Sequence, residues 1–356
     1  MPKIKRVNGN VPVYSSAGHT GWHNKPLVDK RGIIVGRKGT IGSIYKSEKP
    51  FFAIDTVYYI SENDTYCNLD FLFYMLSDLD LNNLNSDSAV PGLNRNTAYD
   101  QDIILPPLPE QKAIAEVLFS LDDKIDLLHR QNKTLEDMAQ VLFCKWFIEE
   151  AKEDWEVGKL GDLLTLKSGF AFKSKDFVDY SNHKIIKIKN IKGNGIIDIT
   201  DTTFIDEEIS QLEKVKFYKL EIGDIMLAMS GNTTGKIGVI CCDENLYLNQ
   251  RVRKFFIEDK IYRNFVYLFL MSGSYEEKIL NMGYGSAQPN VSPSQIHNIE
   301  LSIPPRKTVE LFAYQAQPFF EKIFLNQSQI RTLENLRDIL LLKLMSGAVR
   351  VRGINK

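Results

Sequence analysis

The sequence predicts an α+β protein in which two pseudo-repeated mixed α/β domains are separated by two long helices that form an antiparallel coiled coil. One observation is an internal repeat, because Ser88-Ala89-Val90-Pro91 returns as Ser286-Ala287-Gln288-Pro289, 198 positions later. The same offset relates Pro106-Pro107 to Pro304-Pro305, and apolar residues at heptad spacing follow each proline pair. Solenoid repeats have periods of roughly 20–50 residues, so this longer period indicates a duplicated domain.

The proline pairs set the expected boundaries. We expect a first domain over residues 1–107 and a first long helix over 108–150, then a second domain over 151–305 and a second helix with the C-terminal tail over 306–356. The second copy opens with Trp155-Glu156-Val157-Gly158-Lys159-Leu160-Gly161-Asp162, for which the first copy has no counterpart. The first domain is therefore expected to be short at its N-terminus.

Within the domains, short apolar runs near glycines predict strands over 32–35, 56–60, 224–228 and 252–257. Helices are expected over 69–79 and 265–271. In each copy a polar loop, 86–96 or 283–294, is expected to lead to a strand that stops at the proline pair.

Both long helices carry an a/d seam, which is typical of a coiled coil. The residues that we expect to pair the helices are Ile114, Leu121, Ile125, Asn132, Leu135 and Leu142 in the first, and Phe319, Ile323, Asn326, Ile330, Leu333 and Leu340 in the second. Arg337 interrupts the second seam, and Pro318 should kink or restart the helix. Asn132 and Asn326 would face each other across an antiparallel pair, where they would fix its register; alternatively, both lie at the seam edge in water.

Composition restricts the class of protein. The 356 residues are 44% hydrophobic and 25% charged, as in ordinary globular proteins, and no apolar run of 18 residues or secretory signal is present. The four cysteines lack metal-ligand spacing, so a reduced, cytoplasmic protein is expected. A net charge of −1 argues against a nucleic-acid partner, yet residues 1–49 hold 10 Lys and Arg against 2 acidic residues. The alternative is that oppositely charged blocks neutralise each other on folding.

Catalytic motifs are not recognisable. The segment Gly231–Lys236 imitates a phosphate-binding loop, but three residues rather than four separate its glycines, and Ile237 follows the lysine. The five histidines are scattered and form no His-Glu-x-x-His motif. This pattern favours a binding protein without catalytic or metal residues of its own.

The helical regions and the ends of the domains resemble a known family. Leu105-Pro106-Pro107-Leu108-Pro109-Glu110-Gln111-Lys112-Ala113-Ile114-Ala115, followed by Leu121-Asp122-Asp123-Lys124-Ile125, resembles the central helical region of specificity (S) subunits of type I restriction-modification enzymes. The opening of the second copy is similar to the start of a target recognition domain in that family. The end, Leu340-Leu341-Leu342-Lys343-Leu344-Met345-Ser346-Gly347, is similar to the family's C-terminal ending.

The resemblance implies a non-catalytic subunit that gives a multisubunit enzyme its DNA sequence specificity. Each target recognition domain would read one half of a bipartite site on double-stranded DNA. The helices would act as a ruler between the halves and dock two methyltransferase (M) subunits. S-adenosylmethionine would bind to the M subunits, ATP and Mg would serve the restriction/translocase (R) subunits, and this chain would bind no cofactor itself.

Candidate DNA contacts are basic and polar residues near glycines, since phosphate and base edges are bound by such groups. They are Ser15, Ser16, His19, Lys25, Arg37 and Lys38 in the first domain, and Lys173, Lys187, Lys189, Asn190, Asn232, Thr233, Lys236, Gln250, Arg251 and Arg253 in the second. The loops 91–95 and 288–294 are weaker candidates. A competing interpretation is a coiled-coil scaffold that joins two protein- or glycan-binding modules, and an enzyme ranks last.

Overall fold

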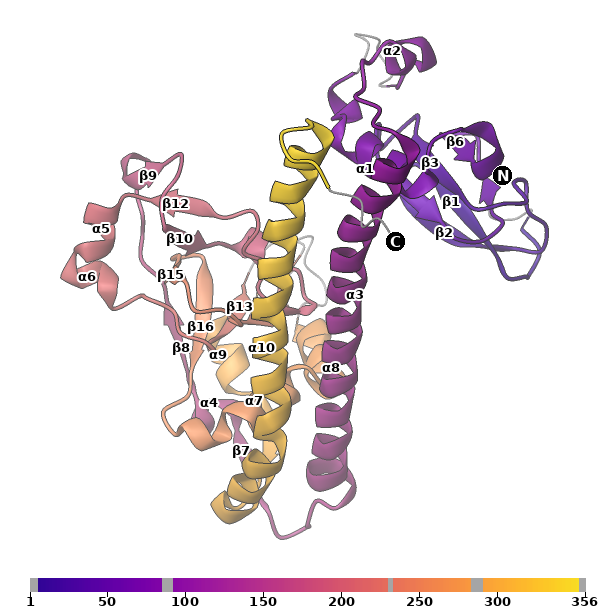
Figure 1. Cartoon of the computed structure of the whole chain (residues 1–356). Coiled ribbons are helices and arrows are strands. Elements are labelled where there is room, and N and C mark those ends of the chain that lie inside the picture. Colours follow the sequence, from indigo (N-terminus) through magenta and orange to yellow (C-terminus); the bar gives the residue numbers. More distant parts are fainter. Residues whose placement is uncertain (1–5, 85–91, 230–232, 283–290, 352–356) are drawn as a thin grey trace. The chain divides into compact units, whose positions relative to one another are not determined.

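The computed structural model describes residues 6–84, 92–229, 233–282 and 291–351 (Figure 1). The chain divides into two compact units, Met1–Asp126 with Thr332–Lys356, and Leu127–Arg331. Each unit therefore contains one globular domain, the beginning of the long helix that follows that domain, and the end of the other long helix. The two-domain α+β prediction is confirmed.

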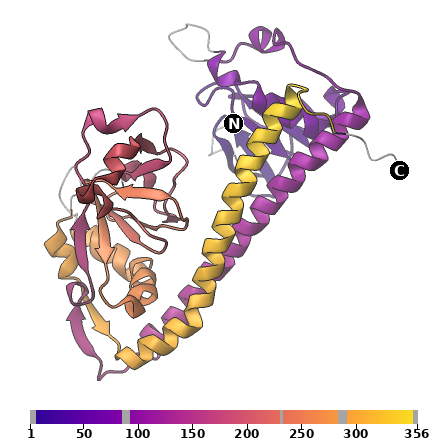
Figure 2. The ribbon, with the colours of Figure 1, turned by 60° about the vertical axis from the view of Figure 1, so that its left-hand side comes forward.

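The long helices are continuous ribbons in Figures 1 and 2. Helix α3 covers Leu108–Cys144 and ends in a π-helical turn, η4 (Lys145–Glu149), and helix α10 covers Arg306–Met345. The expected restart at Pro318 does not occur, because α10 runs on through that residue. Proline cannot donate to the carbonyl of Tyr314, but both residues are exposed, so water can solvate that group.

Asn132 and Asn326 lie in the same layer of the helix pair, as the register hypothesis predicts. The Nδ2 of Asn326 donates to the Oδ1 of Asn132 at 2.9 Å. Both residues are buried: Asn326 is 0% exposed and Asn132 is 4% exposed. The Nδ2 of Asn132 and the Oδ1 of Asn326 have no partner among the described residues. The alternative, a pair of asparagines in water at the seam edge, is wrong.

The described residues of the first domain form two small sheets. One has the order β2-β1-β5 and the other β4-β3-β6. The strands are β1 (Val11–Ser15), β2 (Gly18–His23), β3 (Gly32–Gly36), β4 (Ile44–Ser47), β5 (Phe52–Ala53) and β6 (Val57–Ser61). Helices and turns follow as η2 (Glu62–Asp64), α1 (Leu69–Asp78), η3 (Leu81–Asn83) and α2 (Arg95–Tyr99). The central strand β3 is buried along its whole length, which explains its run of Ile and Val without polar alternation.

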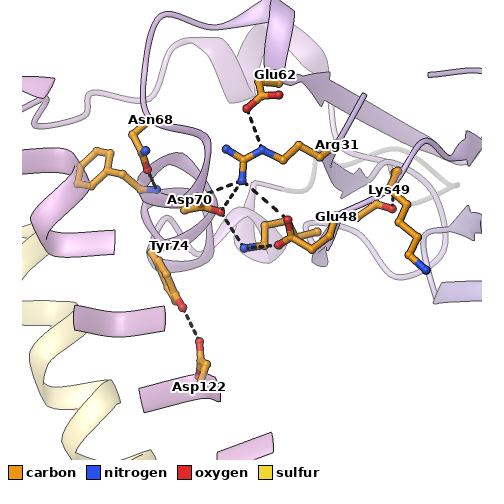
Figure 3. Close-up of polar contacts among 11 residues, drawn as sticks. Arg31, Glu48, Lys49, Glu62, Asn68, Asp70, Tyr74 and Asp122 are labelled. Atoms are coloured by element: carbon orange, nitrogen blue, oxygen red, sulfur yellow. Dashed lines mark hydrogen bonds and ion pairs between the residues drawn. The ribbon is translucent and has the colours of Figure 1, made fainter. Parts of the chain in front are cut away.

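The first domain packs on both long helices. Ile114 and Leu118 of α3 share a core with Leu344 and Met345 at the end of α10. A polar relay joins the same elements. The Tyr74 hydroxyl of α1 donates to Asp122 at 2.6 Å (Figure 3), and Asp122 also accepts from Arg337 of α10 at 3.0 Å. Arg337, which interrupts the apolar seam, is thus paired with a carboxylate.

Beside this relay, an ion-pair cluster holds α1 against the sheet of the first domain (Figure 3). Asp70 of α1 accepts from Lys46 at 2.8 Å and from Arg31 at 3.2 Å, and Arg31 also donates to Glu62 at 2.8 Å. Burial opposes the charge of Asp70, but Lys46 and Arg31 outweigh it and lower its pKa.

The second domain is larger, and its described residues form three sheets. Their orders are β11-β14-β13-β16-β8, β15-β10-β12-β9 and β17-β7. The strands are β7 (Glu156–Lys159), β8 (Thr165–Ser168), β9 (Phe177–Val178), β10 (His183–Ile186), β11 (Gly195–Ile196), β12 (Thr203–Ile205), β13 (Ile225–Ala228), β14 (Ile237–Val239), β15 (Asn245–Leu248), β16 (Val252–Phe256) and β17 (Glu300–Ile303). The helices and turns are α4 (Leu160–Leu163), η5 (Ser174–Asp176), η6 (Ile188–Asn190), α5 (Glu207–Gln211), α6 (Glu213–Lys216), η7 (Lys260–Tyr262), α7 (Arg263–Leu270), α8 (Gly273–Met282) and α9 (Pro293–His297).

An aromatic cluster attaches the second domain to its helix ends. The buried ring of Phe312 on α10 lies 4.7 Å from Phe147 and 6.4 Å from Phe143, centroid to centroid. Phe265 of α7 packs on the same two rings. Such burial of large apolar side chains is the main term that stabilises this contact.

The strand expected before each proline pair forms only in the second copy. There β17 pairs antiparallel with β7, in the segment that opens the domain. The first copy has no strand at residues 101–107, so that expectation is wrong for the first domain. The physical reason is that no described segment of the first domain pairs with these residues, and a strand needs a neighbour for its backbone N–H and C=O groups.

Candidate nucleic-acid interface

The tip of the β1–β2 hairpin and the loop after β3 lie together in the first domain. The carbonyl of Ser16 accepts hydrogen bonds from the Ser43 hydroxyl at 2.6 Å and the Tyr45 hydroxyl at 3.4 Å. These contacts place Ser15 and Ser16 beside the loop that carries Arg37 and Lys38. Four of the six predicted residues of this domain therefore occupy one end of its sheets.

Arg95 joins this group and is absent from the main sequence prediction. The guanidinium carbons of Arg37 and Arg95 lie 5.4 Å and 5.0 Å from the ring centroid of Tyr58. The Tyr58 hydroxyl donates to the carbonyl of Leu93 at 3.2 Å, which fixes the loop before Arg95. Loop 91–95 was the weaker candidate from sequence, and its residue Pro91 lies outside the described residues.

No carboxylate of the described residues forms an ion pair with Arg37, Lys38 or Arg95. All three side chains are exposed. A guanidinium that stacks on an aromatic ring keeps its N–H groups free for an anion or a guanine edge. This cluster can therefore bind DNA phosphate or base edges without first breaking a salt bridge.

His19 and Lys25 do not belong to the cluster of Arg37, Lys38 and Arg95. His19 is exposed and contacts Trp22 edge to face at 4.8 Å, so it lies on β2 near the hairpin tip. Lys25 follows the other end of β2, roughly 20 Å along the strand from the tip. The structure thus does not bring Lys25 together with Arg37 and Lys38.

In the second domain, strand pairing brings several predicted residues together. Strands β10 and β15 are parallel neighbours, with Ile186 opposite Leu248, so both end at the same edge. Lys187 follows the first strand, and Gln250 and Arg251 follow the second. Ala228 at the end of β13 pairs with Val252, so the β13–β14 turn that holds Thr233 and Lys236 adjoins this edge.

The cations at this edge perturb one another. The Lys187 ammonium lies 4.5 Å from the ring centroid of Phe177. Burial lowers the pKa of Lys187, and the charges of Lys189 and Arg251 lower it further. A bound phosphate would relieve this repulsion, so the arrangement favours an anionic partner.

Other predicted residues have partners inside the protein. Asn190 is 1% exposed, and its Nδ2 donates to the carbonyls of Asp198 and Asp201, so it holds the η6 turn instead of facing solvent. Lys189 pairs with Asp201 at 2.6 Å, and Arg253 donates to the carbonyl of Gln250 at 2.8 Å. Lys173 is exposed, while Asn232 lies outside the described residues.

The helix pair of the second unit carries an apolar groove of about 890 Å³. Its lining residues are Thr134, Asp137, Met138, Val141, Leu142, Lys145, Tyr314, Gln315, Pro318 and Phe319. Val141 is 69% exposed and Tyr314 is 83% exposed, which is unusual for large side chains. Exposed apolar patches of this kind mark sites of interaction with other proteins.

Among the described residues, no group of three or more His, Cys, Asp or Glu could hold a metal ion. The adjacent thiols of Cys241 and Cys242 are buried, and this burial raises the pKa of each, which makes them poor nucleophiles. No helix among the residues that the structure describes is long and apolar enough to cross a bilayer.

Comparisons with known proteins agree with this geometry. The model of the "Type I restriction modification DNA specificity domain" matches residues 2–137 and 152–335. The chain is 28% identical to the type I restriction enzyme MjaVIII specificity subunit of Methanocaldococcus jannaschii, over 91% of this chain and 77% of that protein. It is 30% identical to the MjaIX specificity subunit of the same organism, over 77% of this chain and 66% of that protein.

A solved structure shares the fold. The S subunit of the type I restriction-modification system from M. genitalium superposes with a TM-score of 0.63 at 19% identity, over 97% of this chain and 91% of that one. Two copies of the family domain, each followed by a long helix, are thus present in sequence and in structure.

Proposed function

The chain belongs to the family of type I restriction-modification specificity subunits, and from that premise we propose that it reads a bipartite site on double-stranded DNA. The observation that carries the proposal is that both domains present a cluster of cations and pack on a long helix. In each domain, exposed cations gather at one end of the sheets, and each domain packs on the start of its own long helix. Two such clusters fit two half-sites.

The chain acts in this proposal without catalysing a reaction. Two M partners supply the methyl transfer with S-adenosylmethionine, and R partners supply ATP- and Mg-dependent translocation and cleavage. The apolar groove between α3 and α10 supports protein docking on the helices, since its exposed Val141 and Tyr314 would be desolvated by a partner. A cytoplasmic location follows from the DNA substrate.

Net charge refines the proposal. A chain with a net charge of −1 supplies little long-range attraction to DNA, so we expect weak binding by the chain alone. The M subunits would add phosphate contacts, and binding should become tight and sequence-specific in the complex.

The test is to map methylated adenines in DNA from cells that express this chain with its M partner. A motif with two specified halves and an unread spacer is expected. Arg251→Glu should weaken binding of the complex and reduce the salt slope by about one phosphate contact, because Arg251 has no acidic partner among the described residues. The matched control is Lys216→Glu, an exposed lysine of α6 in the same domain that pairs with Glu213.

A methylated half-motif or a palindrome would show that the first domain does not read its half. Absence of any sequence preference in the complex, with intact assembly, would contradict the proposal and favour a scaffold that joins two other binding modules.

A further inference from the structure

The second domain contacts α10 at a second place, beyond the aromatic cluster that attaches it. The core around that cluster includes Phe312 and Phe320 of α10. Arg331 lies three turns further along the same helix, about 16 Å from Phe320 at a rise of about 1.5 Å per residue. Its guanidinium forms an ion pair with Glu244, which directly precedes strand β15 of the domain. The domain is therefore held on α10 at two separated points.

Glu244 is shared by two cations. Its Oε1 pairs with Arg331, and its Oε2 accepts from the Nζ of Lys184 on β10 at 2.8 Å. The three side chains are between 21% and 26% exposed, so solvent and salt screen them less than they screen a surface pair. Each carboxylate oxygen has its own donor, and charge-assisted hydrogen bonds are directional, so the position of α10 against these strands is restricted. We call Lys184, Glu244 and Arg331 the latch.

The latch lies at one end of a strand pair whose other end carries the cations of the candidate DNA interface. Strands β10 and β15 are parallel neighbours (Figure 1), and they begin beside Lys184 and Glu244. Lys187 follows the end of β10, about 10 Å from Lys184 along an extended strand, and Arg251 follows the end of β15. Ile185 between them is fully buried, and close-packed strands of this kind transmit displacement with little deformation.

We propose that the latch is a positioning element for DNA recognition, which keeps the cations beyond β10 and β15 in one orientation relative to α10. This inference rests on the proposed reading of a bipartite site, and it names residues that set the geometry of that reading without contacting DNA themselves. The aromatic cluster fixes the domain near one place on the helix. The latch supplies a second place, which prevents rotation of the domain about the first.

The property that the latch should control is the length of the unread spacer. One base pair added to the spacer displaces a half-site by about 3.4 Å along the DNA axis and rotates it by about 35° around that axis. A domain held at two points cannot follow this displacement, whereas a domain held only at the aromatic cluster can turn toward the displaced half-site. Loss of the latch should therefore relax the choice of spacer length and leave the bases read in each half unchanged.

The test measures binding of the complex with its M partner to DNA duplexes that carry the motif mapped for the wild type. The spacer has the wild-type length or is one base pair longer or shorter. Arg331→Ala and Glu244→Gln should each reduce the preference for the wild-type spacer at least about fivefold. The exchange of Glu244→Lys together with Arg331→Glu should restore the preference, because the carboxylate then lies on α10 and faces two lysines of the domain.

Lys254→Gln is the matched control. Lys254 pairs with Asp224 at 2.5 Å, and the two side chains are 21% and 10% exposed, so this change breaks a shielded ion pair that lies entirely within the domain. The variant should keep the wild-type spacer preference. A relaxed preference equal to that of Arg331→Ala would show that any loss of stability has this effect, and it would overturn the proposal.

A distance measurement on the full chain tests the latch without DNA. Spin labels attached through Asp179→Cys and Leu325→Cys, both at exposed positions, report on the domain and on α10. Cys67 and Cys144 are replaced by serine, and the other two cysteines are buried. In electron–electron double resonance, Arg331→Ala should broaden the distribution of label distances, and the charge exchange should narrow it again.

Unchanged spacer preference and unchanged label distances in Arg331→Ala and Glu244→Gln would overturn the proposal. A change in the bases read at an unchanged spacer would also overturn it, because these residues would then act on base reading. Failure of the wild-type complex to show a two-part motif would contradict the proposed function instead, and the label distances alone would then decide whether the latch holds the domain.

Discussion

The two domains attach through different chemistry to corresponding positions of the long helices. In the second unit, Tyr267 packs edge to face on Phe320 at 5.6 Å, and Ala139 lies buried nearby. The positions 198 residues away in the first unit are Asp122 for Phe320 and Arg337 for Ala139, and there Tyr74 donates to the Asp122 carboxylate. Helix positions that take part in aromatic and apolar packing in one copy therefore carry a polar relay in the other.

The comparison shows which features the two copies share and which they do not. The repeat keeps the helix geometry and the apolar spacing, so both domains find a surface to pack on. Apolar packing supplies more free energy, whereas hydrogen bonds to charged groups supply direction at the cost of desolvation. We expect the second attachment to be the more stable one and the first to be the more sensitive to pH.

The largest effect should come from the aromatic contact. Phe312→Ala should lower the free energy of unfolding by about 3–5 kcal/mol, because it leaves a cavity among Phe143, Trp146 and Phe147. The corresponding change in the first unit is Ile114→Ala, at a residue 1% exposed, with an expected loss near 2–3 kcal/mol. Denaturant unfolding, monitored in each unit by hydrogen exchange, would measure the loss of stability in the two variants. A greater loss from Ile114→Ala than from Phe312→Ala would contradict the expectation that the second attachment is the more stable one.

The polar relay should show a smaller loss. Asp122→Ala removes the acceptor of the Tyr74 hydroxyl and one of the two carboxylates that pair with Arg337, the other being Asp338, and we expect a loss of about 1–3 kcal/mol. Tyr74→Phe removes one hydrogen bond and should cost about 1 kcal/mol. The double variant Tyr74→Phe/Asp122→Ala tests the coupling by denaturant unfolding. A loss equal to the sum of the two single losses would show that Tyr74 and Asp122 are not coupled.

The relay also predicts a pH dependence. Burial raises the pKa of the Tyr74 hydroxyl, and Asp122 raises it further. In the unfolded chain a tyrosine ionises near pH 10, so the folded state holds this proton more tightly. The stabilisation by the Tyr74 hydroxyl is therefore present below pH 10 and lost above it. The stability difference between the wild type and Tyr74→Phe should shrink from pH 8 to pH 11, and a constant difference would contradict this.

The smallest loss of stability is expected at the Asn132–Asn326 pair, which belongs to neither domain–helix contact. Asn326→Leu should cost about 1 kcal/mol, since it leaves the buried amide of Asn132 without its partner. Asn132→Leu combined with Asn326→Leu should restore or exceed wild-type stability, because no polar group then remains buried there. Thermal unfolding would measure both, and a double variant less stable than either single one would refute the argument.

Sequence reasoning succeeded where spacing decides the outcome. The offset of 198 and the heptad seams predicted both domains, both long helices and the Asn132–Asn326 contact. It failed at the strand before Pro106-Pro107, because a strand depends on a partner and none is present among the described residues. The sequence ranks Arg95 only among the weaker candidates of loop 91–95 and places Asn190 at the surface, since neither stacking nor burial can be read from residue type.

By itself, the sequence determined the duplication, the helix pairing and the family, because each depends on residues at fixed distances along the chain. Only the tertiary structure decided that Arg37 and Arg95 stack on Tyr58, that Asp122 pairs with Arg337, and that Asn190 is buried. These are contacts between residues far apart in sequence, whose geometry arises when the chain folds.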